Sequence, residues 1–370
     1  MTKKKKPKVV TSSGNPLADL LRAQHGEESS FLIDGKTTHA CVPTLALSGM
    51  LLNDALGGGL AWGRLVEVFG SESSGKTTLA LDAVACMQRD DPKAYALYLD
   101  VEHALDPRWA SKLGVDFSRT VISQPKSAEQ AADMLTTALE AGELAPRVIV
   151  LDSIAALATE AELAGEAGDQ VVGAVARLLS KSCKKWVRLL ADTGVLLIMI
   201  NQERDQVKFG AAPGAKTTPG GKAVRFYASQ RITVFGKKIY AGKDDPTPIG
   251  IEQHAKVVKN KVAPPFSQAI TRIWFDRGID VHVELLEAAR ASGVVKVDGS
   301  WVKATLPEHP RADASGVVTL GNGLVAAVGL VRTDDVLSNM LREAVRNGVQ
   351  VQPEAKPTKQ AKPTKKGKRG

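Results

Sequence analysis

The stretch Gly70-Ser71-Glu72-Ser73-Ser74-Gly75-Lys76-Thr77 matches the phosphate-loop pattern G-x-x-x-x-G-K-[ST]. A short apolar run, 64–69, comes before it and a helix-like run, 78–85, follows it, so the motif has the strand–loop–helix context that it requires. Its glycines let the backbone wrap closely enough for successive N–H groups to point at one anion, and the helix N-terminus adds a positive end. We predict a phosphate-binding loop here; the alternative is a Gly/Ser turn before an ordinary helix.

Two residues of this loop and one distant aspartate predict a site for a magnesium nucleotide. Lys76 is expected to reach the β- and γ-phosphates of ATP, and the Thr77 hydroxyl is expected to ligate Mg²⁺. Asp152 ends the apolar run 147–151, and a carboxylate at the carboxyl end of a strand can hold the same Mg²⁺ through water. Many strands end in aspartate, so Asp152 alone would be weak evidence for a Mg²⁺ site. Its combination with the phosphate loop supports this role. The predicted cofactors are therefore ATP and Mg²⁺.

Three further side chains are candidates for contact with the nucleotide. Glu102 follows the strand-like run 94–100, at a place where hydrolysis needs a carboxylate that orients water; the alternative is an acidic helix cap. Gln202 follows the apolar run 194–201, and an amide there can touch a γ-phosphate and lose that contact after hydrolysis. Trp109 lies on the next helix, where its ring can stack on a base; the alternative is a core tryptophan.

Composition narrows the class of protein. No apolar run reaches the roughly 18 residues that a membrane helix needs, and the basic N-terminus lacks the apolar segment of a signal peptide. Cys41, Cys86 and Cys183 are widely spaced, which is typical of reduced thiols, and the six histidines form no ligand cluster. We therefore predict a cytoplasmic protein with no membrane partner and no structural zinc.

The net charge of +9 comes from the two ends of the chain. Residues 1–10 carry five lysines, and residues 353–370 carry six lysines and one arginine against Glu354. These segments together carry +11, and 9 − 11 leaves about −2 for the remainder. The folded body is therefore not broadly basic, so a nucleic-acid site on it must be local.

The chain from residue 64 to about 234 alternates apolar strands with helices. Strands are expected at 64–69, 94–100, 119–123, 147–152, 194–201 and 229–234, and helices at about 75–89, 106–113, 127–141 and 170–192. This pattern predicts an α/β fold whose mostly parallel central sheet is covered by helices, with ligands beyond the carboxyl ends of the strands. A β-rich part (229–240, 249–259, 267–276), a helix (280–291) and a small α/β region follow.

Two glycine-bearing loops are candidates for contact with nucleic acid. Residues 203–221 form a long, basic loop in which Phe209 can insert between bases while Arg204 and the lysines meet phosphates; the alternative is a mobile surface loop. Residues 164–173 lead into a helix that carries several cations near one face, for which the alternative is a solvated helix face: Arg177, Lys181, Lys184 and Lys185.

Together the motifs resemble the RecA recombinase family over roughly residues 45–345. The resemblance rests on an ordered set of blocks, which is more specific than a phosphate loop alone: 72–81, 102–107, 112–115, 152–157, 200–202, 217–223 and 257–261. It implies a DNA-dependent ATPase that forms filaments on single-stranded DNA and catalyses homologous pairing and strand exchange in recombination and repair. ATP would lie between neighbouring subunits.

The resemblance also implies roles for single residues. Glu102 is similar to the residue that activates water, Gln202 to the γ-phosphate sensor, and Lys259 and Lys261 to cations that reach the neighbour's ATP; by themselves these lysines are typical of a guarded edge strand. The implied ATP-binding residues are Gly70, Ser71, Glu72, Ser73, Ser74, Gly75, Lys76, Thr77, Thr78, Asp106 and Trp109. The implied DNA-binding residues are Gly165, Glu166, Gly168, Gly173, Arg177, Lys184, Arg204, Lys208, Phe209, Gly210, Lys216, Thr217, Thr218, Gly220, Gly221 and Lys222.

Five segments and several partners follow from the same resemblance. The segments are a disordered basic N-terminus (1–15), an oligomerisation segment (16–44), a RecA-like ATPase core (45–277), a small α/β C-terminal domain (278–348) and a disordered Lys/Pro-rich tail (349–370). The partners are single-stranded and duplex DNA, further copies of the chain, a single-strand-binding protein and a LexA-like repressor of the SOS response.

The chain also departs from the usual pattern of the family. Glu203 and Asp205 stand in the second loop where usual members carry fewer acids, and the tail is basic where theirs is acidic; we expect the tail to attract DNA. Such departures fit a divergent member of viral or bacterial origin. Two rivals share the core: a hexameric helicase, and a regulatory ATPase of the circadian-clock kind or a recombination mediator. The full second loop and the lysine pair 259/261 argue against both.

Overall fold

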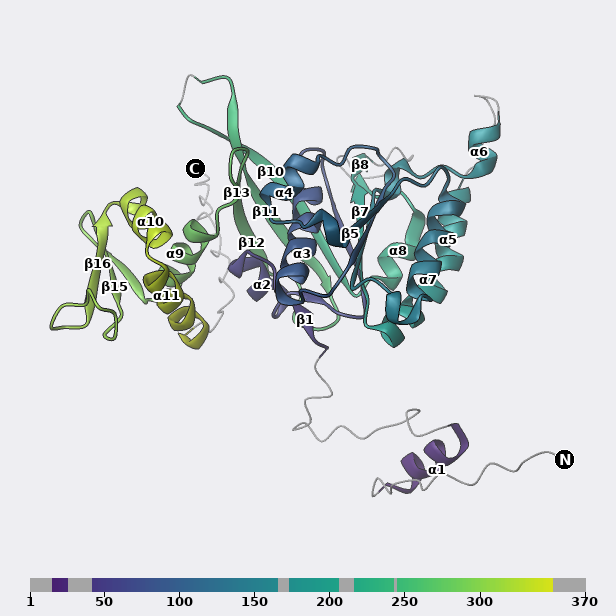
Figure 1. Cartoon of the computed structure of the whole chain (residues 1–370), viewed down its shortest axis with the longest axis horizontal. Coiled ribbons are helices and arrows are strands. Elements are labelled where there is room, and N and C mark those ends of the chain that lie inside the picture. The colour runs from purple at the N-terminus through teal and green to yellow at the C-terminus, as the bar shows by residue number, and fades with distance from the viewer. Residues whose placement is uncertain (1–14, 26–41, 166–172, 206–215, 243–244, 349–370) are drawn as a thin grey trace, which may run out of the picture. The chain divides into compact units, whose positions relative to one another are not determined.

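The computed structural model describes residues 15–25, 42–165, 173–205, 216–242 and 245–348. The chain divides into two compact units, 1–43 and 44–370. In the described part of the first unit lies helix α1 (Pro16–His25) (Figure 1). Asn15 caps this helix, because its Oδ1 accepts from the backbone amides of Leu17 at 3.0 Å and Ala18 at 3.3 Å.

A nine-stranded sheet forms the centre of the second unit, in the order β13-β12-β11-β10-β3-β7-β6-β4-β5 (Figure 1). The strands from β10 to β5 are parallel to one another, and β11, β12 and β13 are antiparallel to their neighbours. The predicted mostly parallel sheet is confirmed. The strands are β3 (Leu65–Gly70), β4 (Ala96–Asp100), β5 (Thr120–Ser123), β6 (Val148–Asp152), β7 (Leu196–Gln202), β10 (Gln230–Tyr240), β11 (Pro248–Asn260), β12 (Gln268–Trp274) and β13 (Gly278–Ile279).

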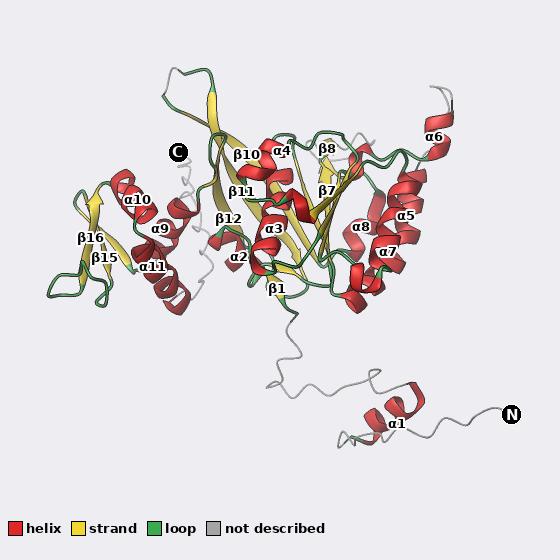
Figure 2. Cartoon of the chain, in the orientation of Figure 1, coloured by secondary structure: helices red, strands yellow, loops and turns green. Residues whose placement is uncertain are grey.

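Helices cover both faces of this sheet (Figure 2). Alternate residues of each strand face opposite sides, so Val66 and Val68 pack under α3 (Lys76–Asp90) while Leu65 faces α7 (Ala174–Thr193). The side of α3 also carries α4 (Pro107–Lys112), and the side of α7 also carries α5 (Ala128–Leu139) and α8 (Gly221–Tyr227). Both faces of the central strands are therefore buried, as the continuous apolar runs predicted.

Short elements connect these layers, and two of them differ from expectation. Helix α2 (Met50–Leu56) was not predicted; it is only seven residues long and ends at Gly57, whose φ of 78° lies in the left-handed region. The loop 203–221 is not wholly without structure, because β8 (Arg204–Asp205) pairs with β9 (Lys216–Thr217). The remaining elements are β1 (Thr44–Leu45), β2 (Leu60–Ala61), η3 (Phe117–Arg119), η4 (Gly142–Leu144), η5 (Ile154–Ala156) and α6 (Glu160–Ala164).

A small α/β region, called the C-terminal domain below, follows the sheet within the second unit and has its own hydrophobic cluster. It consists of α9 (Val281–Ala291), the antiparallel strands β14 (Val295–Asp298), β15 (Trp301–Thr305) and β16 (Val317–Asn322), and the helices α10 (Leu324–Thr333) and α11 (Asp335–Gly348). Asp280 joins it to the sheet: it accepts from Trp274 Nε1 at 2.7 Å and from Arg332 at 3.2 Å. Within the ranges described, no helix is long and apolar enough to cross a membrane.

Candidate functional site

The phosphate loop joins β3 to α3 and closes on its own lysine. The Nζ atom of Lys76 donates to the carbonyl oxygen of Ser71 at 2.6 Å and to that of Gly70 at 3.4 Å. A Cβ at Gly70 would lie 1.9 Å from the carbonyl oxygen of Val234, so only glycine lets the loop leave the sheet here. Gly75, with φ of 85°, begins α3 in the left-handed conformation.

The two residues proposed for Mg²⁺ lie in contact. Thr77 Oγ1 donates to Asp152 Oδ2 at 2.9 Å, although 75 residues separate them. Tyr98 donates its hydroxyl to the same carboxylate oxygen at 2.6 Å. Burial raises the pKa of Asp152, and the two hydrogen bonds act in the opposite direction. A hydroxyl beside a carboxylate is a donor set of hard oxygens, which is the kind that Mg²⁺ takes.

Glu102 lies beside this pair, at the carboxyl end of β4. Ser153 and Gln202 both donate to Glu102 Oε1, the latter from Nε2 at 3.2 Å. The structure therefore brings the carboxylate expected to orient water together with the amide expected to sense phosphate. They meet because the strands that carry them are parallel, so that their carboxyl ends share one edge of the sheet.

The electrostatics of the site centre on Lys76. Burial lowers the pKa of this lysine, and the surrounding carboxylates of Asp152, Glu102, Glu72 and Glu203 raise it. Buried charges of both signs are stable only when paired. This arrangement fits a magnesium nucleotide, since Lys76 and the loop amides would meet the phosphates while the carboxylates would face the cation.

A pocket of about 570 Å³ opens beside the loop. Trp109 lies along it, half-buried, with its Nε1 donating to Thr78 Oγ1 at 3.1 Å. The ring therefore borders the pocket and also packs on the core, and its stacking on a base stays a prediction. Asp106 is not among the lining residues; it caps α4 by accepting from the Arg108 amide at 2.8 Å. The lining residues are Glu72, Ser73, Ser74, Gly75, Lys76, Thr77, Thr78, Trp109, Gly236, Lys238, Pro248, Ile251, Ile273 and Phe275.

Lys259 and Lys261 do not join this site within one chain. Lys259 pairs across the ladder with Arg231, at the beginning of β10, so it lies toward the opposite edge of the sheet from the phosphate loop. Its Nζ donates to the carbonyl oxygens of Arg225 and Phe226, each at 2.8 Å. Burial and the nearby Lys261 lower its pKa. Any contact of these lysines with ATP must involve a second copy of the chain.

Two residues that the sequence did not single out support the site. Tyr98 is the first, through its bond to Asp152. Gln253, which is buried on β11, is the second: its Nε2 donates to the carbonyl oxygen of Ser74 in the phosphate loop at 2.8 Å. A signal existed for Gln253, since it interrupts an inward-facing series of apolar residues at 251, 255 and 257. For Tyr98 the apolar run 96–99 gave no such signal.

The ends of the two candidate DNA loops lie together. A Cβ at Gly221 would lie 2.9 Å from the Cβ of Ala176, so the first turns of α8 and α7 touch. A Cβ at Gly220 would lie 2.8 Å from Ile154, which follows β6. Gly165 ends α6, Gly173 begins α7, and Arg177, Lys184 and Lys222 are exposed, whereas Thr218 is buried.

Part of the predicted DNA set falls outside the description. Glu166, Gly168, Lys208, Phe209 and Gly210 lie outside the described residues. Only the backbone is described for Arg204, Lys216 and Thr217, which take part in the β8–β9 pair. The structure therefore locates the beginnings and ends of both loops and leaves their DNA contacts as predictions.

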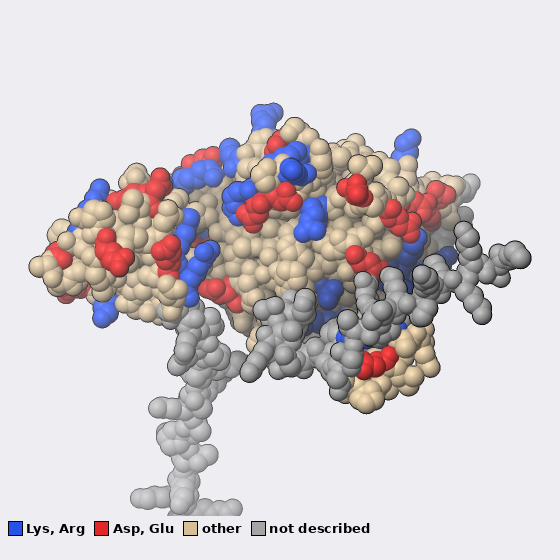
Figure 3. Space-filling model, turned by 60° about the horizontal axis from the view of Figure 1, so that its bottom comes forward, with Lys and Arg blue, Asp and Glu red and all other residues tan. Residues whose placement is uncertain are grey.

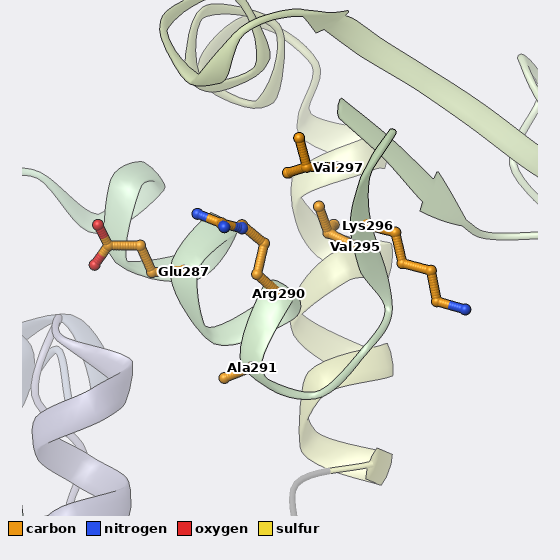
Figure 4. A pocket seen from close by; sticks show the side chains of 6 residues that line it. All are labelled: Glu287, Arg290, Ala291, Val295, Lys296 and Val297. Atoms are coloured by element: carbon orange, nitrogen blue, oxygen red, sulfur yellow. The ribbon is translucent and has the colours of Figure 1, made fainter. Parts of the chain in front are cut away.

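A second hollow, of about 680 Å³, lies on the C-terminal domain between α9 and β14. Figure 4 shows Arg290 and Glu287 projecting from the helix, with Lys296 pointing away from them. The remaining lining residues are Ala291, Val295 and Val297. Glu287, Arg290 and Lys296 are charged and the other three lining residues are apolar, and none of the residues proposed for ATP or Mg²⁺ lines this hollow.

The fold and the site define a nucleotide-binding protein of the phosphate-loop class. A sequence model described as the RecA N-terminal domain matches residues 17–280. Protein RecA of Chlorobaculum tepidum is 39% identical over 335 residues, which cover 90% of this chain and 91% of that protein. Protein RecA of Thermus aquaticus is 45% identical over 264 residues, which cover 70% of this chain and 74% of that protein.

Among solved structures, one described as the crystal structure of the RadB recombinase is similar with a TM-score of 0.48 and 20% identity, covering 64% of this chain and 98% of that chain. The match to the domain family and the identities to the RecA proteins establish the relationship. This chain belongs to the RecA family.

Proposed function

We propose that this chain is a DNA-dependent ATPase and recombinase, which forms filaments on single-stranded DNA and catalyses homologous pairing and strand exchange. One observation carries the proposal. The hydrogen bond from Gln202 to Glu102 joins the carboxylate of the nucleotide site to the residue directly before the loop 203–221. A change at the nucleotide is therefore one residue away from a candidate DNA contact, as a DNA-gated ATPase requires.

The side chains of the site support ATP hydrolysis by positioning. When bound, magnesium ATP supplies the γ-phosphate that water attacks and the cation that offsets its charge. Glu102 orients the attacking water and accepts its proton, and Ser153 holds the carboxylate by donating to Oε1. Lys76 leaves the carbonyl oxygens of its own loop for phosphate oxygens. Gln202 is free to exchange its bond to Glu102 for a phosphate oxygen.

Both ends of the second loop are tied to this site. At its start, the Glu203 amide donates to the carbonyl oxygen of Gly70 at 3.1 Å. At its end, Asn201 Nδ2 donates to the carbonyl oxygen of Pro219 at 3.1 Å and to the buried Glu67 at 3.0 Å. We infer that loss of the γ-phosphate would alter the positions of both ends of the loop. This supports coupling of DNA affinity to the state of the nucleotide.

The test of this function is the rate of ATP hydrolysis with and without single-stranded DNA. A recombinase of this kind should hydrolyse ATP slowly alone and much faster with DNA, and should then exchange strands between homologous substrates. Hydrolysis that is indifferent to DNA would overturn the proposal in favour of a regulatory or mediator ATPase. Unwinding by closed rings would favour a helicase.

We predict that replacing Tyr98 by phenylalanine raises the Mg²⁺ concentration needed for half-maximal ATP hydrolysis roughly 10- to 100-fold. The Tyr98 hydroxyl is one of two donors to Asp152 Oδ2, and a hydrogen bond to a charged partner contributes about 1.5–3 kcal/mol. The measurement is a Mg²⁺ titration of hydrolysis, in which the rate at saturating Mg²⁺ should stay within about twofold because Asp152 itself remains. Tyr95→Phe, at an exposed tyrosine, is the control. If the Mg²⁺ concentration for half-maximal hydrolysis did not change, the Tyr98 hydroxyl would have no role at the Mg²⁺ site and the ring would serve only in packing.

We also predict that Val121→Lys prevents filament assembly. Strand β5 is the last in the order of the sheet and exposes Val121 and Ile122, of which 55% and 40% are accessible. An open edge with apolar side chains is a template for pairing with another chain, and a lysine there opposes pairing. Electron microscopy with single-stranded DNA and ATP should show filaments for the parent and for Leu144→Lys, an exposed control, and none for the variant. Filaments of normal length in Val121→Lys would exclude β5 from the subunit contact.

A further inference from the structure

A cleft of about 770 Å³ lies between the core and the C-terminal domain, apart from the two pockets described above. The core contributes α2 with the residues before it, and Arg89 at the end of α3; the C-terminal domain contributes α9 and α11. None of the side chains proposed for ATP lines this cleft. It is therefore separate from the phosphate-loop pocket, and no motif predicted it.

Three arginines face this cleft against a single carboxyl group. Arg342 and Arg346 come from α11 and Arg89 comes from the opposite wall, while Asp54 is the acidic residue among the lining. Arg89 already has a partner, since its Nε lies 3.1 Å from Asp90 Oδ1. Over the described ranges of the chain, neither Arg342 nor Arg346 has a carboxylate within ion-pair distance. The cleft therefore has an excess of positive charge.

The position of the two α11 arginines makes this excess notable. Arg342 and Arg346 are one helical turn apart, and like charges at this spacing destabilise a helix by repulsion. A bridging anion would convert that repulsion into attraction from both guanidinium groups. On the face shown in Figure 3, basic side chains lie among acidic ones where the C-terminal domain, at the left, meets the core.

The rest of the lining suggests what the anion carries. Val281, Leu285 and Val345 form an apolar wall beside the arginines. A guanidinium group can donate two parallel hydrogen bonds to two oxygens of one phosphate. An apolar wall suits a flat organic group that is attached to the phosphate. A volume of about 770 Å³ lies in the range that holds a small organic ligand.

We propose that this cleft is a second binding site, which takes a phosphate-bearing ligand of nucleotide size through Arg342 and Arg346. The phosphate groups that it recognises occur in free nucleotides and in the DNA backbone, and the size of the cleft favours the free nucleotide. Because its walls belong to two domains, an occupant would hold the C-terminal domain in place on the core. The proposal does not depend on the ATPase activity proposed above.

The test counts nucleotides bound per full-length chain, with radiolabelled ADP and Mg²⁺ at equilibrium. The parent should bind two, and Arg342→Gln/Arg346→Gln should bind one, with affinity at the second site lowered roughly 10- to 100-fold by loss of two charge-assisted contacts. Arg290→Gln, at an exposed arginine of the same domain, should still bind two. Lys76→Ala should lose the other site and keep the one in the cleft.

The outcomes separate this proposal from the proposed function. One nucleotide per parent chain, lost in Lys76→Ala and kept in the double arginine variant, would overturn the cleft site alone. One nucleotide that is lost only in the double arginine variant would support the cleft and overturn the phosphate-loop site. Weaker binding of duplex DNA by the double variant, with two nucleotides still bound, would assign the arginines to DNA and overturn the nucleotide. Arg342→Lys/Arg346→Lys, which keeps the charge and loses the paired geometry, should bind with intermediate affinity.

Discussion

Replacing Glu102 by glutamine is expected to lower the rate of ATP hydrolysis about 10²- to 10⁴-fold, the range that a positioned general base contributes. The glutamine retains Oε1, so the bonds from Ser153 and Gln202 can persist and the strand ends stay in place. It cannot accept a proton from water, so the chemical step is lost while nucleotide binding remains. The measurement is the rate of phosphate release with single-stranded DNA, beside the affinity for ADP.

Glu143→Gln is the matched control for this substitution. Glu143 is an exposed carboxylate in η4, just before β6 begins, and so lies at the far end of that strand from Asp152. It should hydrolyse ATP at the parental rate. If Glu102→Gln also hydrolyses ATP normally, a different carboxylate must orient the water. The first carboxylate to test would then be Glu203, whose charge also raises the pKa of Lys76.

Replacing Glu284 by glutamine is expected to remove most of a pH dependence of stability between about pH 4.5 and 7. Glu284 belongs to α9 of the C-terminal domain but reaches the core, where it accepts from the Met50 amide at 2.9 Å and from the Thr271 hydroxyl at 3.2 Å. Burial raises its pKa to about 7 from the ordinary 4.5. The folded chain therefore keeps this proton over a pH range in which the unfolded chain has lost it.

The sign follows from the number of protons bound. Between pH 4.5 and 7 the folded state binds more protons at this group than the unfolded state, so the free energy of unfolding falls as pH rises. A shift from 4.5 to about 7 corresponds to at most about 3–4 kcal/mol above pH 7, at roughly 1.4 kcal/mol per pKa unit. Glutamine imitates the protonated acid, because it can accept from Met50 and donate to Thr271. The variant should match the parent near pH 5 and exceed it near pH 8.

Urea unfolding at pH 5 and pH 8 measures this difference. Glu343→Gln, at an exposed glutamate of α11, should keep the parental pH dependence. The same pH dependence in Glu284→Gln as in the parent would mean that Glu284 is not the group responsible. Because Glu284 connects α9 to α2, the result also reports how firmly the C-terminal domain is held on the core at neutral pH.

The sequence predicted correctly which residues lie at the carboxyl ends of the parallel strands. Asp152, Glu102 and Gln202 were each predicted at a strand end, and the structure brings them together because parallel strands end at one edge. The positions of residues on the antiparallel strands were harder to predict. Lys259 lies on a strand that runs the other way, so its distance from the phosphate loop depends on a strand order that composition and spacing do not reveal.

What the sequence missed depends on partners far along the chain. Tyr98 donates to a residue 54 positions away, and Gln253 to one 179 positions away, so the partner of neither side chain could be found from nearby sequence, although Gln253 itself interrupts an apolar series. Helix α2 is too short for a helical period to be recognised. The cleft with Arg342 and Arg346 has walls from four separate parts of the chain.

The short pair β8–β9 has a consequence for how the family can diversify. It closes the second loop at its base, where Arg204 pairs with Thr217 and Asp205 with Lys216, and Asn201 fastens Pro219 just beyond. Segments of other lengths can therefore be grafted between 206 and 215 without altering the strand ends that hold Glu102 and Gln202. The contacts proposed between this loop and DNA could then change while Glu102 and Gln202 keep their places at the strand ends.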